Sequence, residues 1–252
     1  MKPFAKSATL FNLLRSQEFG GRKECLAMLK VGGVEWAHDP GDDTEPEDFT
    51  WTTEQDGGKV LDTDGLWLRF NGMALPVLPA LYIALNKPAG VECSHAPEAH
   101  EPVFGFFPPP FLRRGLQPVG RLDADTTGLL LLTDDGTFNH AVTSPRKTLP
   151  KVYRVRLKHP LTDEQVGMLE QGVVLRDDPK PTEPATVRRV GEREADIIIS
   201  EGRYHQVKRM GAAVGNRVES IHRSAIGPLE LGDLPEGEWR FLAAEEIESL
   251  GA

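Results

Sequence analysis

The strongest constraint on the fold is an abrupt change of character within residues 120–136. Residues 120–127 read GRLDADTT, residues 128–133 read GLLLLT, and a turn, DDG, follows them. An apolar run this short, bounded by turn residues, favours a buried strand, although periodicity alone also permits a buried helix. The segment therefore predicts a polar loop held on a rigid buried element, which is a common arrangement of functional sites.

The chain downstream of this segment mixes strand and helix signals. Residues 151–157 alternate, with Tyr153, Val155 and Leu157 on one predicted face. The further predicted elements are a helix that starts at a capping box at 162–165 and ends at Gly172, a strand at 195–200, a helix at 204–214 and a short helix at 245–250. They do not alternate in a βαβ rhythm, so we expect an α+β fold with a mixed or antiparallel sheet.

The first 79 residues have a different organisation. Two short apolar-faced helices are predicted within residues 8–36, and the second ends at Gly32-Gly33. An acidic, turn-rich stretch at 38–64 is typical of a loop or an insertion, and a strand at 66–70 follows it. Because prolines then mark a linker, we expect one domain at 1–79 and a second at 80–252.

Charge is unevenly distributed along the chain. The net charge of −9 argues mildly against nucleic-acid binding, yet residues 111–158 hold nine Lys and Arg against four Asp and Glu. Residues 200–223 have a balance of +3, whereas residues 224–252 have −6 and residues 1–79 have −5. The basic stretches are either solvated faces or an interface for an anionic partner.

Other features bound the class of protein. There is no run of 18 apolar residues and no secretory signal, so we expect no membrane span. Cys25 and Cys93 have no paired spacing, which fits a reducing cytoplasm and predicts neither a disulfide framework nor a cysteine zinc site.

Two carboxylates stand out in the polar loop, Asp123 and Asp125. An aspartate in such a loop most often caps a turn through its own backbone. Two carboxylates two residues apart also fit the acid–base chemistry of a hydrolase, but a loop does not fix their separation. His205, Lys208 and Arg209 form the polar face of the predicted 204–214 helix, which is a solvated face or a binding face.

Residues 120–136 resemble the signature loop and strand of the pseudouridine synthases that modify ribosomal RNA. Three further segments resemble that family in the same order: YIALNKPAG at 82–90, KVYRV at 151–155 and EGRYHQVKRM at 201–210. The segments SPR at 144–146 and PEGEWR at 235–240 are most similar to the subfamily of ribosomal small subunit pseudouridine synthase A. The resemblance implies a catalytic domain with a mixed sheet and a central cleft, preceded by a small S4-like α/β module.

The resemblance also implies roles for single residues. Asp123 corresponds to the catalytic aspartate, Tyr153 to a tyrosine that stacks on the target base, and Lys208 to the cation that pairs with the aspartate. Arg209 and Arg203 are alternative partners for that charge. The implied reaction isomerises uridine without a redox cofactor or ATP, and His205 lacks the neighbouring ligands of a metal site.

The implied partner is ribosomal RNA, naked or in a small-subunit assembly intermediate, and the implied enzyme is a cytoplasmic monomer. The predicted RNA-contacting residues are Arg121, Arg203, His205, Gln206, Arg209 and Arg146. The N-terminal region departs from the S4 pattern, with ATLFN at 8–12 and the acidic stretch at 38–64. Since acidic surfaces repel phosphate, we expect this module to keep its fold without binding RNA strongly.

Three alternatives remain at this point. The chain is a non-catalytic RNA-binding or ribosome-assembly protein on the same scaffold, a hydrolase that uses Asp123 and Asp125, or a synthase that acts on a large-subunit uridine. The combination of Asp123, Tyr153 and Lys208 favours catalysis, because a protein that only binds RNA has no need of a carboxylate in a cleft.

Overall fold

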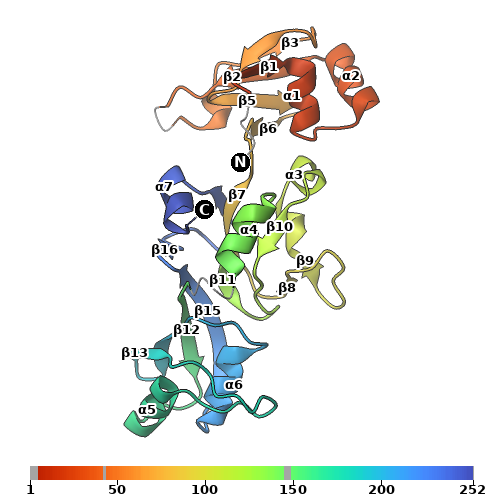
Figure 1. Ribbon diagram of the computed structural model, residues 1–252. Helices are drawn as coiled ribbons and strands as arrows, with labels where there is room; N and C mark the ends of the chain where they lie inside the picture. The colour runs from red at the N-terminus through yellow and green to blue at the C-terminus, as the bar shows by residue number, and fades with distance from the viewer. Residues whose placement is uncertain (1–4, 42–43, 145–148, 252) are drawn as a thin grey trace. The chain divides into compact units, whose positions relative to one another are not determined.

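The computed structural model describes residues 5–41, 44–144 and 149–251 (Figure 1). The chain forms two compact units. The small unit comprises Met1–Leu81 and Phe107–Leu116, and the large unit comprises Tyr82–Phe106 and Gln117–Ala252. The polar loop and all the described candidate site residues belong to the large unit.

The small unit contains a four-stranded antiparallel sheet in the order β3-β2-β5-β6 and a two-stranded β1–β4 pair. Its elements are β1 (Ser7–Thr9), α1 (Leu10–Ser16), α2 (Arg22–Val31), β2 (Val34–His38), a 3₁₀ turn (Pro46–Asp48), β3 (Thr52–Glu54), β4 (Val60–Asp62), β5 (Leu66–Phe70), β6 (Met73–Pro76) and α3 (Pro109–Arg113). The two predicted helices and the end of the second at Gly32 are confirmed.

The acidic stretch at 38–64 is more ordered than a loop, so that interpretation was wrong in part. It supplies β3, which pairs with β2, and β4, which pairs with β1. Phe49 and Leu61 from this stretch are buried. Its glycines and acidic residues form turns between short strands, a pattern that resembles a continuous loop in the sequence.

The large unit is built on a nine-stranded sheet whose main path runs β13-β14-β12-β15-β11-β7-β17. Its elements are β7 (Tyr82–Lys87), β8 (Val91–Glu92), β9 (Glu101–Pro102), a 3₁₀ turn (Val103–Phe106), β10 (Gln117–Val119), β11 (Thr127–Thr133), α4 (Gly136–Thr143), β12 (Lys151–Leu157), α5 (Asp163–Gln171), β13 (Thr186–Gly191), β14 (Glu194–Ile199), α6 (Gln206–Ala213), β15 (Val218–Ile226), β16 (Leu229–Glu230), β17 (Trp239–Phe241) and α7 (Ala244–Ser249). The apolar run at 128–133 is therefore a strand, and the predicted α+β class with a mixed sheet is confirmed.

One half of the sheet centres on β7 and β11, which pair antiparallel over six residues. Nearly every residue of both strands is buried, which explains why they read as continuous apolar runs instead of alternating ones. Phe138 of α4, Ile247 of α7 and Leu250 directly after α7 complete this core. Helix α4 follows β11 and is capped by Asp135, whose side chain accepts hydrogen bonds from the amides of Thr137 and Phe138.

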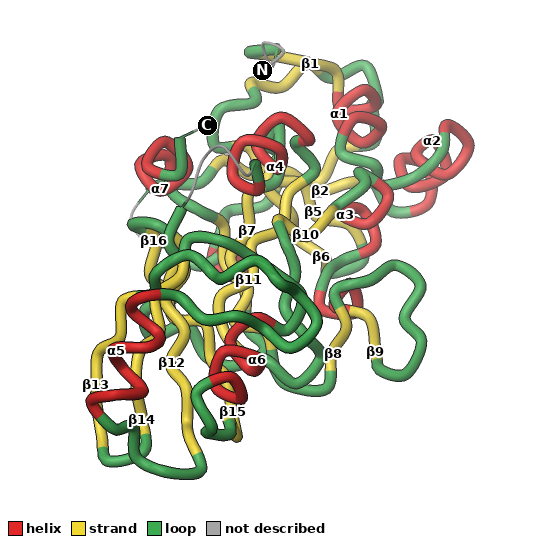
Figure 2. Tube along the Cα trace, turned by 60° about the horizontal axis from the view of Figure 1, so that its bottom comes forward, coloured by secondary structure: helices red, strands yellow, loops and turns green. Residues whose placement is uncertain are grey.

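The other half centres on β12, β14 and β15, against which α5 and α6 pack (Figure 2). Val155 and Leu157 are buried while Arg154 and Arg156 are exposed, as the alternation predicts. The capping box of Thr162 and Gln165 also forms as predicted.

The two halves join where β11 and β15 pair in parallel through only two residue pairs, Thr127 with His222 and Gly128 with Arg223. Gly128 has a φ of +99°, and a Cβ at this position would lie 2.3 Å from the Arg223 carbonyl oxygen. Only glycine permits this close approach without displacing backbone. The polar loop at 120–126 lies directly before this junction, so the joining of the halves also positions the loop.

Candidate active site

The loop at 120–126 is fixed by its own backbone and by one buried cation. The Thr126 amide donates to the Asp123 carbonyl at 3.1 Å, and the Gly90 amide donates to the Ala124 carbonyl at 2.8 Å. Lys87, at the end of β7, has a fully buried side chain beneath the loop. These contacts hold the backbone on both sides of the Asp123 side chain.

The Lys87 ammonium makes three hydrogen bonds to carbonyl oxygens: Pro88 at 2.8 Å, Thr126 at 2.9 Å and Ala124 at 3.2 Å. Burial lowers the pKa of Lys87, and nearby negative charges, including those of Asp125 and Asp123, partly offset this effect. The sequence analysis gave Lys87 no role. The available signal was a lysine at the end of an apolar strand, a residue type that is rarely buried without a specific partner.

The Asp123 carboxylate lies between two nitrogen donors. Lys208 Nζ is 3.3 Å from Oδ2, and His205 Nε2 is 3.3 Å from Oδ1. Lys208 Nζ is also 2.6 Å from Asp125 Oδ1. Burial opposes the charge of Lys208, but its contacts with Asp125 and Asp123 outweigh that effect and raise its pKa. Burial also opposes the charge of Asp125, and the hydrogen bond from Lys208 nevertheless lowers the Asp125 pKa.

The other two cations proposed for Asp123 are engaged elsewhere. Arg203 forms ion pairs with Asp178 at 2.8 Å and with Glu201 at 3.0 Å. The Arg209 guanidinium donates to the Tyr204 carbonyl at 3.1 Å. Of the three sequence candidates, Lys208 is therefore the one that contacts the carboxylate.

His205 lies just before α6 and not within a helix, so the predicted helix start at 204 was wrong. His205 adopts a left-handed conformation with a φ of 47°, and its ring stacks on Tyr204 at 3.8 Å. Helix α6 begins at Gln206, whose side chain is buried and bonded to Glu201 and to the Arg203 amide. His205 in this left-handed position and Lys208 on α6 both reach the Asp123 carboxylate.

A cavity of about 720 Å³ opens beside Asp123. That volume is in the range of small-molecule sites and is large enough for a nucleotide. The predicted site residues that line it are Arg121, Asp123, Tyr153, Arg203, His205 and Gln206. Lys208 contacts Asp123 from outside the lining, and Arg146 lies outside the described residues. The cavity wall also includes Lys151 and Arg223, which the sequence analysis did not select.

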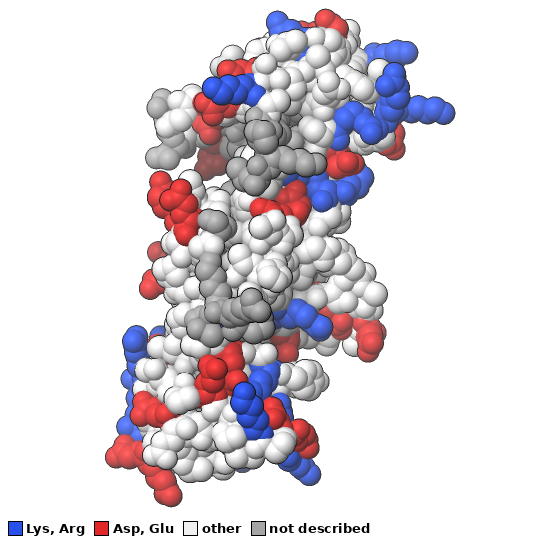
Figure 3. All heavy atoms as spheres, in the orientation of Figure 1, with Lys and Arg blue, Asp and Glu red and all other residues white. Residues whose placement is uncertain are grey.

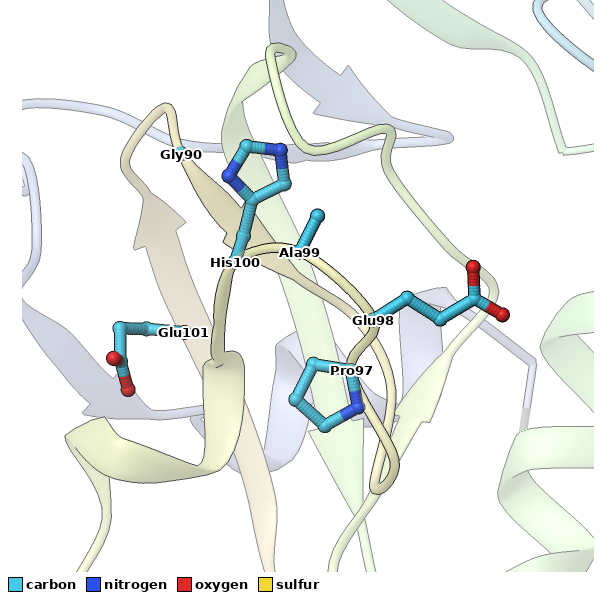
Figure 4. Close-up of a pocket in the computed structure, with 6 residues that line it drawn as sticks. All are labelled: Gly90, Pro97, Glu98, Ala99, His100 and Glu101. Carbon is cyan, nitrogen blue, oxygen red and sulfur yellow. The ribbon is translucent and has the colours of Figure 1, made fainter.

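A second, smaller hollow lies in the β8–β9 loop (Figure 4). Figure 4 shows the carboxylates of Glu98 and Glu101 pointing to opposite sides of this loop and away from its interior. The loop closes on Glu92, whose carboxylate accepts hydrogen bonds from the amides of residues 98–100. We therefore interpret this hollow as a by-product of loop closure.

Acidic and basic side chains are distributed unevenly over the visible surface of the large unit. Figure 3 shows acidic side chains gathered over α7, whereas both signs are interspersed around α5 and α6. Within the described residues no group of three or more His, Cys, Asp and Glu is placed to hold a metal ion. Of the helices in the described ranges, none is long and apolar enough to cross a membrane.

Comparison with known proteins identifies the class. Residues 81–213 match the family model described as RNA pseudouridylate synthase. The chain therefore belongs to the RNA pseudouridylate synthase family, whose members isomerise uridine in RNA to pseudouridine.

Individual relatives agree with this assignment. The chain is 46% identical over 191 residues to "Ribosomal small subunit pseudouridine synthase A" of Pasteurella multocida (strain Pm70), covering 75% of this chain and 81% of that protein. It is 42% identical over 232 residues to the protein of the same name from Vibrio vulnificus (strain CMCP6), covering 91% and 93%. A solved structure described as "Crystal structure of pseudouridylate synthase" matches with a TM-score of 0.66 and 33% identity, covering 96% of this chain and 99% of that one.

Proposed function

We propose that this enzyme converts a specific uridine of small-subunit ribosomal RNA to pseudouridine, with Asp123 as its catalytic carboxylate. The observation that carries the role of Asp123 is its place on the cavity wall between Lys208 and His205. The names of the relatives support the choice of RNA.

The geometry supports a defined division of labour. A uridine extruded from folded RNA enters the cavity, and Tyr153 on its wall offers a ring for stacking. Lys208 supplies a positive charge 3.3 Å from the Asp123 carboxylate, which attacks the nucleotide or removes a sugar proton. The bond from N1 to C1′ breaks, the base turns, and C5 bonds to C1′. C5 loses a proton and N1 gains one, so the product is an isomer of the substrate.

The predicted RNA contacts divide by exposure. Arg121 is exposed at the cavity rim and is free to meet a phosphate, so we assign it RNA binding. Arg203 and Gln206 form internal bonds, and we assign them the additional task of holding the segment that positions His205. Arg209 and Arg146 keep their predicted role as phosphate contacts.

The remaining elements of the proposal concern the whole chain. The small unit serves as an S4-like module that binds RNA weakly because its charge balance is negative. The enzyme acts in the cytoplasm as a monomer, on naked RNA or on an assembly intermediate of the small subunit.

Mapping of pseudouridines in ribosomal RNA tests this function. Deletion of the gene is expected to remove one pseudouridine from the small-subunit RNA, and the wild-type gene is expected to restore it. Loss of a large-subunit pseudouridine instead would contradict the proposed substrate. An unchanged map accompanied by a defect in subunit assembly would favour a non-catalytic assembly protein.

A further inference from the structure

Arg223 is a buried arginine at the centre of the large unit. It lies on β15, where its register partners are Gly128 on β11 and Tyr153 on β12. Its side chain is 4% exposed and lines the same cavity as Asp123. Arg223 therefore lies on the strand between the one that follows the Asp123 loop and the one that supplies the candidate stacking tyrosine.

The guanidinium of Arg223 is only partly satisfied. Its Nε donates to the Leu129 carbonyl oxygen at 2.7 Å, which anchors the side chain. Its Nη2 is buried and has no hydrogen-bond partner among the residues that the structure describes. The Arg223 Cζ is 6.0 Å from the centre of the Tyr153 ring. A buried donor without an acceptor is costly, so an unpaired donor on a residue that lines a cavity indicates an acceptor that arrives with the ligand.

Lys151 adds a second cation to this wall. It is the first residue of β12, lines the cavity, and donates to the Ser200 carbonyl at 3.3 Å. Burial lowers the pKa of Lys151, and the neighbouring Arg223 charge lowers it further. Within the described ranges, neither Lys151 nor Arg223 forms an ion pair with an Asp or Glu. These two cations of the wall therefore have no carboxylate partner among the described residues.

The reaction supplies a matching group. When the bond from N1 to C1′ breaks, its electron pair stays on the base, and the resulting negative charge is shared among N1 and the two carbonyl oxygens of uracil. Fixed donors stabilise a transition state most when they point to atoms on which charge develops. A phosphate is another oxygen acceptor in RNA, but it stays on the hydrated backbone, whereas Arg223 is almost fully enclosed.

We propose that Arg223 is a further catalytic residue, whose Nη2 donates to a carbonyl oxygen of the target uracil while the base is detached from the sugar, with Lys151 reinforcing the charge of this wall. The inference rests on the proposed function for its substrate. It assigns the inner wall of the cavity to the base and leaves the exposed rim at Arg121 to the phosphates.

The test combines protein variants with altered substrates in a thermodynamic cycle. Arg223→Lys keeps a positive charge but lacks the second guanidinium donor, and it is compared with the wild type on a small-subunit RNA fragment that contains the target uridine. We expect kcat to fall about 100-fold with KM changed less than about threefold. Arg154→Lys is the matched control. Arg154 is an exposed arginine on β12 that does not line the cavity and that pairs with Asp196. The kinetics of this variant are expected to equal those of the wild type.

The altered substrates carry sulfur in place of uracil O2 or O4, or a neutral methylphosphonate in place of the phosphate 5′ to the target. Sulfur is a weaker acceptor, so one thio-substitution is expected to slow the wild type and to add little to the defect of Arg223→Lys. Coupling to the methylphosphonate alone would overturn the assignment to the base. A variant that loses thermal stability and shows no coupling to either oxygen type would overturn the catalytic role in favour of a structural one.

Wild-type turnover keeps this test separate from the proposed function. If the wild type converts neither a naked small-subunit fragment nor an assembly intermediate of the small subunit, the proposed substrate is contradicted, and the same cycle is run on large-subunit RNA that the enzyme does convert. The coupling between Arg223 and the uracil oxygens then supports or overturns the inference on that substrate.

Discussion

The loop that carries Asp123 and the segment at 201–206 that carries His205 both border the cavity, but different interactions hold them. Beneath the loop, the buried Lys87 bonds to backbone carbonyls. In the second segment, the partly exposed Arg203 pairs with Asp178 and Glu201. Salt and pH weaken exposed ion pairs far more than buried hydrogen bonds. The comparison therefore implies that salt and pH change the position of the Asp123 carboxylate less than they change the contacts of the segment that carries His205.

The largest loss of stability is expected at Gly128, where β11 pairs with β15. Gly128→Ala would place a Cβ 2.3 Å from the Arg223 carbonyl at a φ of +99°, so the junction must shift. We expect a loss of about 4 kcal/mol in the free energy of unfolding, measured with urea. Gly136→Ala, where nothing lies within 4 Å of the added Cβ, is the control and is expected to be neutral. Equal stability of the two variants would contradict the close approach.

Gly128 also illustrates what sequence alone can predict. The short apolar run that begins at Gly128 and ends at a turn favoured a strand, and the strand is present and buried on both faces. The parallel pairing of its first residues with β15 was beyond prediction, since it depends on two pairs formed across about ninety residues of chain.

The next effect concerns the buried cation. Lys87→Met removes three hydrogen bonds to backbone carbonyls and takes the Lys87 donor from Pro88 and Thr126, while the Ala124 carbonyl keeps the Gly90 amide. The free energy of unfolding should fall by about 3 kcal/mol, equally in low salt and in 1 M salt. A loss below about 1 kcal/mol, or one that salt abolishes, would show that Lys87 does not anchor the loop.

Lys208, which is partly exposed, should show a small effect on stability and a large effect on activity. Lys208→Met removes two ion pairs that are partly open to solvent, so stability should change by less than about 1 kcal/mol. Activity should fall about 100-fold, because Asp123 loses the cation that contacts its carboxylate. Steady-state kinetics beside urea unfolding measures both. A stability loss as large as that of Lys87→Met would remove the contrast between the two lysines.

The site shows the same limit of sequence reasoning. The resemblance to the pseudouridine synthases selected Asp123, Tyr153 and Lys208, which the fold brings to one region, while their catalytic roles stay predictions. Helical periodicity misplaced His205, because a single left-handed residue cannot be read from spacing. Lys87 and Arg223 escaped notice because burial of a cation is a tertiary property.

The smallest effect is a pH dependence of stability. The folded-state pKa of Asp125 is lowered, since the hydrogen bond from Lys208 outweighs burial. The unfolded chain therefore binds the proton more tightly, so this contribution is present above about pH 4 and is lost on further acidification. Because Asp125 is largely exposed, the free energy of unfolding of the wild type should exceed that of Asp125→Asn by less than about 1 kcal/mol at neutral pH. That difference should vanish near pH 3; a difference that grows on acidification would contradict the lowered pKa.

The central claim is that Asp123 performs the chemistry, and Asp123→Asn tests it most directly. This substitution keeps the size of the side chain and removes only the ionisable carboxylate. Purified variant and wild type are compared by the rate of pseudouridine formation in small-subunit ribosomal RNA, with melting temperatures measured in parallel. We predict a rate at least about 10³-fold lower at an unchanged melting temperature. A variant that folds normally and keeps more than about a tenth of the wild-type rate would contradict the account.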